Sequence, residues 1–364
     1  MTAQSKVSRR SAGPAGWLLV LACSMLLAGC APLGYLAQSV GGHLQLVAAA
    51  RPVPDWLADD ATPPALRDRL LLSQRIRDFA VSELKLPDNA SYRRYADIGR
   101  RAAVWNVVAA PELSLRLKTW CYPVVGCVGY RGYYDRADAD RAVAPLRDEG
   151  LDVLVYAVPA YSTLGKIPGE YFADPLLNTF IHYPEGQLAG LIFHELSHQV
   201  VYLAGDTGFN ESFATAVERI GARRWLSQRG SEAARQEYER QQSRQQDFRE
   251  LTRQTRRELE AVYDGDGSAQ DKRAARDRVM ASMRERYRLL KEQRWDGFSG
   301  YDGWIAAANN ASLGLIAAYN SKVPEFEAIF ERSGSNFDAF YAEVKRISRL
   351  PDAERKALFA AESN

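Results

Sequence analysis

Helical and strand-like patterns of apolar residues alternate along the chain. Between Ala65 and Leu84 apolar residues recur at three- and four-residue steps, which is typical of one buried helix face. Residues 151–156 are mostly apolar and follow a glycine, as expected of a buried strand. Further strands or hairpins are predicted at 103–108, 113–120 and 125–134, and further helices at 135–149, at 306–319, from Pro324 and at 337–348. We therefore expect a mostly helical α+β fold with a small mixed or antiparallel sheet.

Polar residues dominate a long stretch in the second half of the chain. Between Gln228 and Arg294 arginine, glutamate and glutamine prevail, and sparse apolar residues recur at helical spacing. The pattern breaks at residues 264–267, Asp-Gly-Asp-Gly, which is a turn sequence. We therefore predict a charged helical hairpin over 228–296 that is solvated on one face. Three roles stay open for it: shielding a cleft, binding a partner protein, or spacing the rest of the chain.

The N-terminus has the pattern of a secretory leader. Lys6, Arg9 and Arg10 form a positive segment, and an apolar segment over residues 17–27 is too short to span a bilayer comfortably. The leader, residues 1–29, ends in Leu-Ala-Gly before a cysteine, which resembles a bacterial lipobox. The alternative is a plain signal peptide that is cut at another position.

Cysteine usage agrees with export to an oxidising compartment. Cys30 would carry the lipids, palmitate included, because several acyl chains on one residue anchor a protein stably. Ala31 follows in place of aspartate, and the usual sorting pattern then implies the outer membrane, facing the periplasm, with the inner membrane as the alternative. Cys121 and Cys127 remain and close a small loop, so we expect a disulfide between them.

The stretch 191–202 contains His194, Glu195 and His198 in the pattern His-Glu-x-x-His. Positions i and i+4 of a helix lie about 40° apart around its axis, so both imidazoles project from one side. Two neutral imidazoles at that spacing can bind one Zn²⁺. Glu195 lies at the edge of the same face, where it can take a proton from an attacking water. The plainer interpretation is a pair of core histidines that bond to the backbone.

A catalytic zinc site usually has a third protein ligand and one open position. Downstream, Gly205 is expected to end the motif helix and Asn210 to cap the next one. Glu211 would then stand in the first turn of that helix and face the two histidines across a short loop. The plainer interpretation is an acid that interacts with the helix dipole.

Two further acids are candidates for a supporting role. Glu218 lies seven residues after Glu211 on the same helix face, so it could accept the second ring N–H of a zinc-binding histidine and fix its tautomer. A solvated surface glutamate is the alternative. Asp206 is a rival for the same supporting role.

Residues 210–214, Asn-Glu-Ser-Phe-Ala, resemble the Asn-Glu-Gly-Phe-Ala signature of the aminopeptidase-N group of gluzincin peptidases. Two features differ from that group. Ser212 stands in place of glycine, and the twelve residues between His198 and Glu211 are fewer than the group usually has. The shorter connection affects the expected details of the fold more than the expected ligand set.

Three further motifs extend the resemblance over nearly the whole mature chain. They are Trp120 to Cys127, Tyr130 to Tyr133 and Asn309-Asn310-Ala311, and with them the chain is similar to the predicted zinc aminopeptidase family of bacterial lipoproteins. The resemblance implies a zincin-like core, one Zn²⁺ per chain, and hydrolysis of a peptide substrate. The word aminopeptidase rests on this family analogy alone.

Peptidases of this kind add two expectations. They commonly present an edge strand that pairs with an extended substrate. The best candidate is the segment just upstream of the motif helix, Tyr161, Ser162, Thr163, Leu164 and Gly165, with a connecting loop as the alternative. Gluzincins also often place a tyrosine opposite the zinc to stabilise the oxyanion. Tyr301 and Tyr319 are candidates here, with ordinary packing as the alternative.

Composition limits the remaining functions. The chain of 364 residues can bury one large or two modest domains, and 25% charged with 46% hydrophobic residues is ordinary for a globular protein. Loss of the leader changes the formal net charge from +2 to −1, so no basic field argues for nucleic-acid binding. The expected segments are the leader 1–29, a lipidated N-terminus and linker 30–64, a catalytic core 65–227, the hairpin 228–296 and a C-terminal helical part of the catalytic domain 297–364.

These observations together predict a zinc metallopeptidase, an aminopeptidase by analogy, that is tied to the membrane through lipid on Cys30. Glu195 would activate the water. Three alternatives stay open: a zinc endopeptidase, a zinc amidase on cell-wall peptides, and a non-enzymatic envelope scaffold that contains zinc.

Overall fold

A computed structural model of the chain describes residues 30–122, 126–160, 173–320 and 322–362. It separates into two units, Met1–Gln45 and Leu46–Asn364. The described residues of the first unit belong to helix α2 (Cys30–Ala48). Among the described residues, no helix has both the length and the apolar character that crossing a bilayer requires.

The strands of the second unit are short. In chain order they are β1 (Arg51–Pro52), β2 (Arg94–Ala96), β3 (Val104–Pro111), β4 (Trp120–Tyr122), β5 (Gly126–Val128), β6 (Arg131–Tyr133), β7 (Leu151–Val158) and β8 (Leu176–Leu177). β3 is central in an antiparallel sheet of order β6-β3-β7, where Asn106 pairs with Gly132 on one side and Tyr156 on the other. A mixed sheet has the order β1-β2-β8, and β4 pairs with β5 alone. Sheets this small bury little by themselves, so helices supply most of the core.

Helices make up most of the described chain. After α2 they are α3 (Val53–Ala58), α4 (Pro64–Ser82), α5 (Arg136–Asp148), α6 (Glu185–Ser197), α7 (Thr207–Arg229), α8 (Glu232–Asp264), α9 (Ala269–Gln293), α10 (Asp302–Ala307), α11 (Asn310–Asn320), α12 (Val323–Arg332), α13 (Phe337–Ser348) and α14 (Asp352–Glu362). A mostly helical chain with small sheets agrees with the predicted α+β class.

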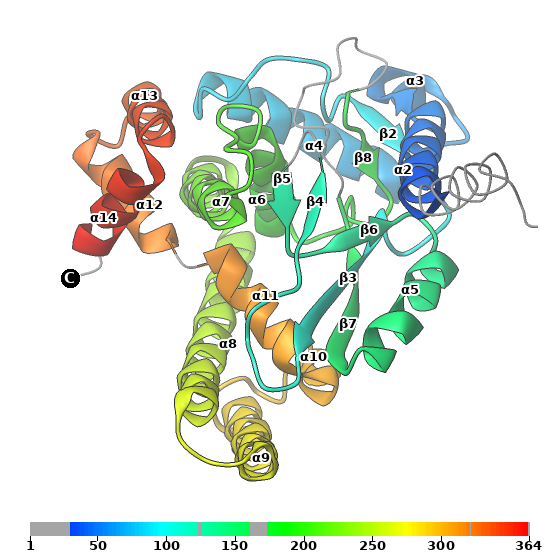
Figure 1. The fold of residues 1–364 in the computed structure, drawn as a ribbon. Coiled ribbons are helices and arrows are strands. Elements are labelled where there is room, and N and C mark those ends of the chain that lie inside the picture. The colour runs from blue at the N-terminus through cyan, green and yellow to red at the C-terminus, as the bar shows by residue number, and fades with distance from the viewer. Residues whose placement is uncertain (1–29, 123–125, 161–172, 321, 363–364) are drawn as a thin grey trace, which may run out of the picture. The chain divides into compact units, whose positions relative to one another are not determined.

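The largest apolar cluster, which we call the main core, packs α4, α6, α7, α12 and α13 together. Phe213 on α7 is fully buried, and its ring contacts those of Phe326, Phe340 and Tyr341. Phe193 on α6 is also fully buried. Figure 1 shows α6 and α7 next to one another, with α12, α13 and α14 gathered beside α7. The main core therefore forms around the two helices that carry the His-Glu-x-x-His motif and Glu211.

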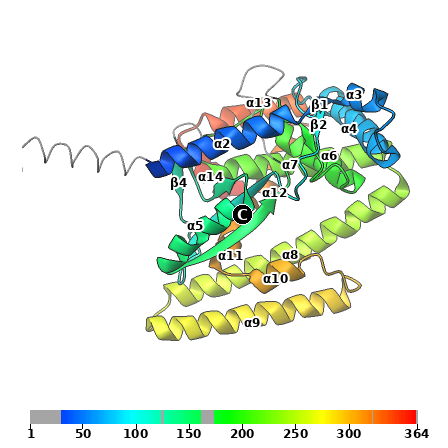
Figure 2. The ribbon, with the colours of Figure 1, turned by 90° about the vertical axis from the view of Figure 1, so that its right-hand side faces the viewer.

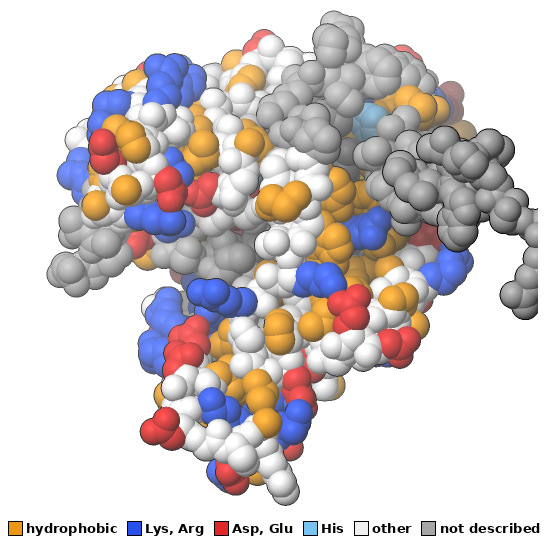
Figure 3. Space-filling view, in the orientation of Figure 1, with side chains coloured by type: hydrophobic (Ala, Val, Ile, Leu, Met, Phe, Trp, Pro, Cys, Tyr) orange, Lys and Arg blue, Asp and Glu red, His pale blue; other side chains and the backbone are white. Residues whose placement is uncertain are grey.

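A second apolar cluster, which we call the hairpin cluster, joins α8, α9 and α10. The ring of Phe248 on α8 stacks on that of Tyr301 with centroids 4.1 Å apart. Figure 2 shows α8 and α9 as two long antiparallel helices, which confirms the predicted hairpin. Positive and negative side chains are interspersed over this part of the molecule (Figure 3), and Arg286 and Glu258 form one of the pairs at 2.8 Å. The outer faces of the hairpin are therefore mostly charged, and its buried apolar residues lie along the seam between its helices.

Two residues fix the hairpin to the antiparallel sheet. The side-chain amide of Asn310 donates to the carbonyl of Glu112 at 2.6 Å, and its oxygen accepts from the Tyr263 hydroxyl at 2.8 Å. Asp152 on β7 forms an ion pair of 2.5 Å with Arg276 on α9. Asn310, which belongs to one of the motifs behind the family resemblance, thus connects three parts of the fold.

The structure differs locally from the sequence prediction. The strand predicted over 113–120 is present only at Trp120, because Leu115 is used by a loop that packs into the hairpin cluster. The predicted linker contains β1 and α3, and Val53 is fully buried in the main core. The segment has regular structure because β1 pairs with β2, and this pairing could not be predicted from the sequence of the segment alone.

Candidate metal centre

α6 brings the two histidines of the motif to one side. His194 lies in its last turn, and His198 follows its last residue with helical angles of φ −60° and ψ −22°. The two rings are therefore close, with centroids 5.0 Å apart. The helix was predicted to continue to Gly205 and this was wrong, since it ends at Ser197 and Gly205 lies in the connection with φ +83°. The two imidazoles keep their helical spacing because His198 comes directly after the last residue of α6 and still has helical backbone angles.

The start of α7 fixes the position of Glu211. The predicted cap, Asn210, was wrong, because α7 begins at Thr207 and is capped by Asp206, whose side chain accepts from the Phe209 N–H at 2.9 Å. The Asn210 side chain instead bonds to both backbone groups of Leu203, accepting at 2.7 Å and donating at 2.8 Å. Asn210 therefore ties the loop between α6 and α7 to the helix that carries Glu211. Asp206 is used as a cap and does not support a histidine.

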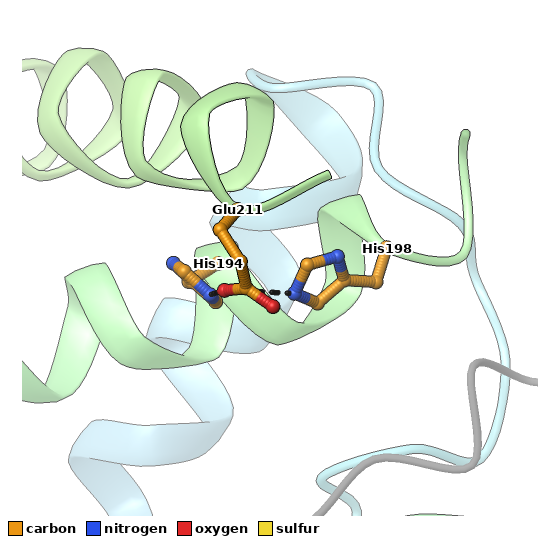
Figure 4. A group of neighbouring side chains, drawn as sticks. All are labelled: His194, His198 and Glu211. Atoms are coloured by element: carbon orange, nitrogen blue, oxygen red, sulfur yellow. Dashed lines mark ion pairs between the residues drawn. The ribbon is translucent and has the colours of Figure 1, made fainter. Parts of the chain in front are cut away.

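The carboxylate of Glu211 points between the two imidazoles (Figure 4). One of its oxygens lies 3.3 Å from Nε2 of His194 and 3.9 Å from Nε2 of His198. The ligand atoms of the three residues all lie within 4.8 Å of one another. Ligand atoms about 2.0–2.2 Å from a tetrahedral zinc ion are roughly 3.4 Å apart, so this nitrogen and oxygen set fits such an ion. Tertiary packing thus brings together the three residues that the sequence predicted as ligands.

Glu218 reaches the other side of His194. Its carboxylate lies 3.1 Å from Nδ1 of His194, the ring nitrogen that faces away from Glu211. A glycine on α6 allows this approach, since a Cβ at Gly190 would lie 3.0 Å from Cγ of Glu218. A carboxylate at Nδ1 favours the tautomer that leaves Nε2 free for a metal. The structure therefore places Glu218 beside His194, whereas its rival Asp206 lies at the start of α7.

Burial and charge compete at these side chains. Burial lowers the pKa of His198 to about 4. Burial also opposes protonation of His194, but the bonds with Glu211 and Glu218 outweigh it and raise the pKa of His194 well above its usual value. The same histidines overcome the effect of burial on Glu211 and lower its pKa. Burial raises the pKa of Glu195 to about 7, which suits a group that exchanges a proton near neutral pH.

Three neighbours of the centre were missed by the sequence analysis. The ring of Tyr202 packs against that of His198 with centroids 6.4 Å apart. Asp174 is 1% exposed, and its charge contributes to the raised pKa of Glu195. Tyr92 is also buried, and its hydroxyl has no hydrogen-bond partner among the described residues. Tyr202 lies four residues after His198 and was detectable by spacing, whereas Asp174 and Tyr92 come from separate segments.

A hollow of about 280 Å³ opens beside His194 and Glu195. Its other walls come from α7 and from the first half of α8, including Glu218, Tyr238 and Gln241. The Tyr238 hydroxyl and the Gln241 side-chain oxygen are buried and lack partners among the described residues. Polar groups in this state are available to a bound ligand, because burial without a hydrogen bond is costly.

The other predicted site residues have different outcomes. The structure corrects Tyr301, whose ring stacks on Phe248 in the hairpin cluster and does not join the metal residues. Tyr319 lies on α11, but its side chain is outside the described residues, and so is the whole segment 161–165 that was predicted to pair with substrate. Both therefore stay predictions.

Cys121 and Cys127 form a disulfide across β4 and β5. The ribbon packs on the connection between α6 and α7, since a Cβ at Gly126 would lie 2.9 Å from the backbone nitrogen of Gly205. Gly126 itself has φ +76°, a conformation that glycine adopts without strain. The disulfide-closed ribbon thus supports the loop that positions Glu211 against the histidines.

The serine that departs from the glycine of the gluzincin signature also has a structural use. Ser212 is fully buried, and its hydroxyl accepts a hydrogen bond of 3.2 Å from the backbone N–H of Lys322. Lys322 precedes α12, so this bond links α7 to the C-terminal helices. The substitution is therefore compatible with Glu211 keeping its place.

Comparison with known proteins places the chain in a family. The family described as "Putative aminopeptidase" matches residues 34–359, which include the three residues of the metal centre and the hairpin. No curated protein and no solved structure matches the chain. The match covers far more than half of the sequence, so the chain belongs to this aminopeptidase family, and a peptidase-like function follows in that coarse form.

Proposed function

We propose that the protein is a zinc-dependent peptidase of the aminopeptidase type. One observation carries the proposal: His194, His198 and Glu211 present ligand atoms within 4.8 Å of one another, next to Glu195. The family supports peptidase chemistry, and the donor set is the one that catalytic zinc prefers. One Zn²⁺ per chain would be held by these three side chains.

When bound, zinc supplies Lewis-acid chemistry to the scissile carbonyl and the attacking water. The protein side chains do the rest. Glu195 takes a proton from the water and passes it to the leaving amine. Glu218 holds His194 in the tautomer that keeps Nε2 available. Tyr202, which packs against His198, is the tyrosine that we assign to stabilising the oxyanion.

We further propose that the protein acts at the periplasmic face of the outer membrane, anchored through lipid on Cys30. The basic and apolar leader and its Leu-Ala-Gly-Cys ending support this location. The disulfide between Cys121 and Cys127 is consistent with an oxidising compartment. Labelling with a radioactive fatty acid tests the anchor, since a Cys30→Ser variant should lose the label.

A substitution at Glu195 gives the sharpest test of the proposed chemistry. Glu195→Gln keeps the size of the side chain but removes the base, so turnover of aminoacyl amides should fall by about 10² to 10⁴ while one zinc per chain stays bound. Glu185→Gln on the same helix is the matched control. Glu185 accepts a hydrogen bond from Trp225 Nε1 at 2.9 Å, and a glutamine side chain can accept the same bond. The Glu185→Gln variant should therefore keep the activity of the wild type.

Two results would overturn the proposal. One is full activity of Glu195→Gln, and the other is a pure active protein without stoichiometric zinc. The same assay separates the alternatives. Preference for peptides with a blocked amino terminus would indicate an endopeptidase, and exclusive cleavage of peptidoglycan fragments would indicate an amidase.

A further inference from the structure

A second, larger hollow continues from the one beside the metal centre. It has a volume of about 910 Å³ and lies between α7, α8 and α12. Tyr238 and Gln242 line both hollows, so the two are contiguous along α8. A ligand that is bound at His194 and Glu195 can therefore extend into the second hollow without leaving the protein surface.

Most charges around the second hollow are paired. Arg223 contacts Glu327 at 3.0 Å, and Arg253 contacts Glu250 at 2.6 Å. Asp247 contacts Arg294 at 3.0 Å. Five wall residues therefore already have a partner of opposite charge, namely Arg223, Glu327, Arg253, Glu250 and Asp247.

Arg219 on α7 and Arg249 on α8 line the second hollow and are its two unpaired arginines in the described part of the chain. The exposed Glu239 also lines it and is unpaired among the described residues. Among the residues that the structure describes, neither guanidinium makes an ion pair or a hydrogen bond. Burial and, after it, the charge of Arg219 lower the pKa of Arg249 to about 10, so the two cations also repel each other. A partly buried pair of like charges is unfavourable without a counter-ion.

We propose that Arg219 and Arg249 bind the C-terminal carboxylate of a short peptide whose cleaved bond lies at the metal centre. This inference rests on the proposed peptidase function. A guanidinium binds a carboxylate through two parallel N–H donors, which makes arginine the suitable residue. Such a carboxylate would offset one of the two positive charges and so weaken the repulsion between the two guanidinium groups.

Helix geometry gives the length of that peptide. Glu211 and Arg219 are eight residues apart on α7, which is about 12 Å along the helix axis. An extended peptide rises about 3.3 Å per residue, so three to five residues would span the interval once the reach of the arginine side chain is included. The substrate class is therefore short peptides with a free carboxylate, and longer chains would have to leave the hollow.

Peptide pairs test the inference on the full-length protein in detergent. Each pair has one sequence, three to five residues long, with a free or an amidated C-terminus. The wild-type protein should cleave the free acid with about ten- to a hundredfold higher kcat/KM, chiefly through KM, because a charge-assisted bond is lost in the amide. Arg219→Gln and Arg249→Gln should abolish this preference and leave cleavage of the amidated peptide unchanged.

A matched control and a third peptide sharpen the result. Arg223→Gln removes an arginine of the same hollow that is already paired with Glu327, so it should keep the preference. An amidated peptide that ends in aspartate distinguishes the two sources of a carboxylate. Its cleavage should be no faster than that of the amidated parent if the terminal carboxylate is the group recognised. Equal rates for free and amidated peptides in the wild type would overturn the inference, and so would a preference that survives both substitutions.

The inference can fail separately from the proposed function. If no peptide is cleaved, calorimetric binding of the same free and amidated peptides to the wild type and to the Arg219→Gln and Arg249→Gln variants decides it. Tighter binding of the free acid that both substitutions remove would still establish the carboxylate site. Equal binding would reject the site even if the protein proves to be a zinc peptidase.

Discussion

The main core and the hairpin formed by α8 and α9 are stabilised in different ways. In the main core, aromatic rings pack against α6 and α7, and the candidate metal ligands are held between these two helices. In the hairpin the apolar residues form one seam, and the other faces carry ion pairs such as Arg288 with Glu285 at 2.7 Å. Close packing fixes side chains to fractions of an ångström, whereas solvated ion pairs contribute little each. The candidate metal ligands are therefore placed precisely by the aromatic packing of the main core. The hairpin contributes an exposed surface and one wall of the hollow beside His194.

Removing one buried ring from each region gives the largest expected contrast. Phe213→Ala leaves a cavity in the main core and should lower the free energy of unfolding by about 3–5 kcal/mol, with loss of bound zinc. Phe248→Ala should also destabilise the protein, but the damage should stay in the hairpin cluster and zinc content should be preserved. Urea unfolding with parallel metal analysis measures both effects. Equal loss of zinc in the two variants would show that both regions unfold as one cooperative unit.

A smaller effect is expected from the residue behind His194. Glu218→Gln should weaken zinc binding by about ten- to a hundredfold, because the tautomer of His194 is no longer fixed by a carboxylate. Competition with a fluorescent chelator measures the affinity. Glu258→Gln, the same change in the hairpin, should leave the affinity unaltered. An equal loss in both variants would mean that the hairpin contributes to the metal centre.

The smallest expected effect is a dependence on pH in the hairpin. Hydrogen bonds from Arg286 lower the pKa of Glu258 below its ordinary value of 4.5. The folded state therefore gains stability from this pair above the ordinary pKa and loses it as the pH falls through the lowered one. Both side chains are partly exposed, so Glu258→Gln should cost about 1 kcal/mol or less at pH 7. The cost should shrink in urea titrations as the pH falls below 4.5 and through the lowered pKa, and a cost that persists in acid would point to packing in place of charge.

Periodicity predicted much of the fold because it reports which face of an element is buried. The helices near 65–84 and 337–348 and the hairpin with its break at 264–267 lie close to their predicted positions. The strand over 113–120 failed because Leu115 is buried by a loop, and apolar periodicity does not distinguish a strand from a loop that packs on a core. The prediction of the helix cap also failed, because Asp206 and Asn210 are both suitable residues at a helix start. The path of the loop between α6 and α7 decided that Asp206 caps α7 and that Asn210 bonds to the loop.

The sequence by itself determined which kinds of side chain stand at the candidate metal centre. His194, Glu195 and His198 lie within five consecutive residues, so their relative positions follow from helical geometry and require no contact with the rest of the chain. Tertiary structure decided which distant groups complete it. The approach of α7 to α6 brought Glu211 and Glu218 to His194, and it placed Tyr301 in another cluster altogether. It also left Arg219 and Arg249 without partners at one hollow, and no spacing along the chain could show this, because the pairing of charges depends on which helices pack together.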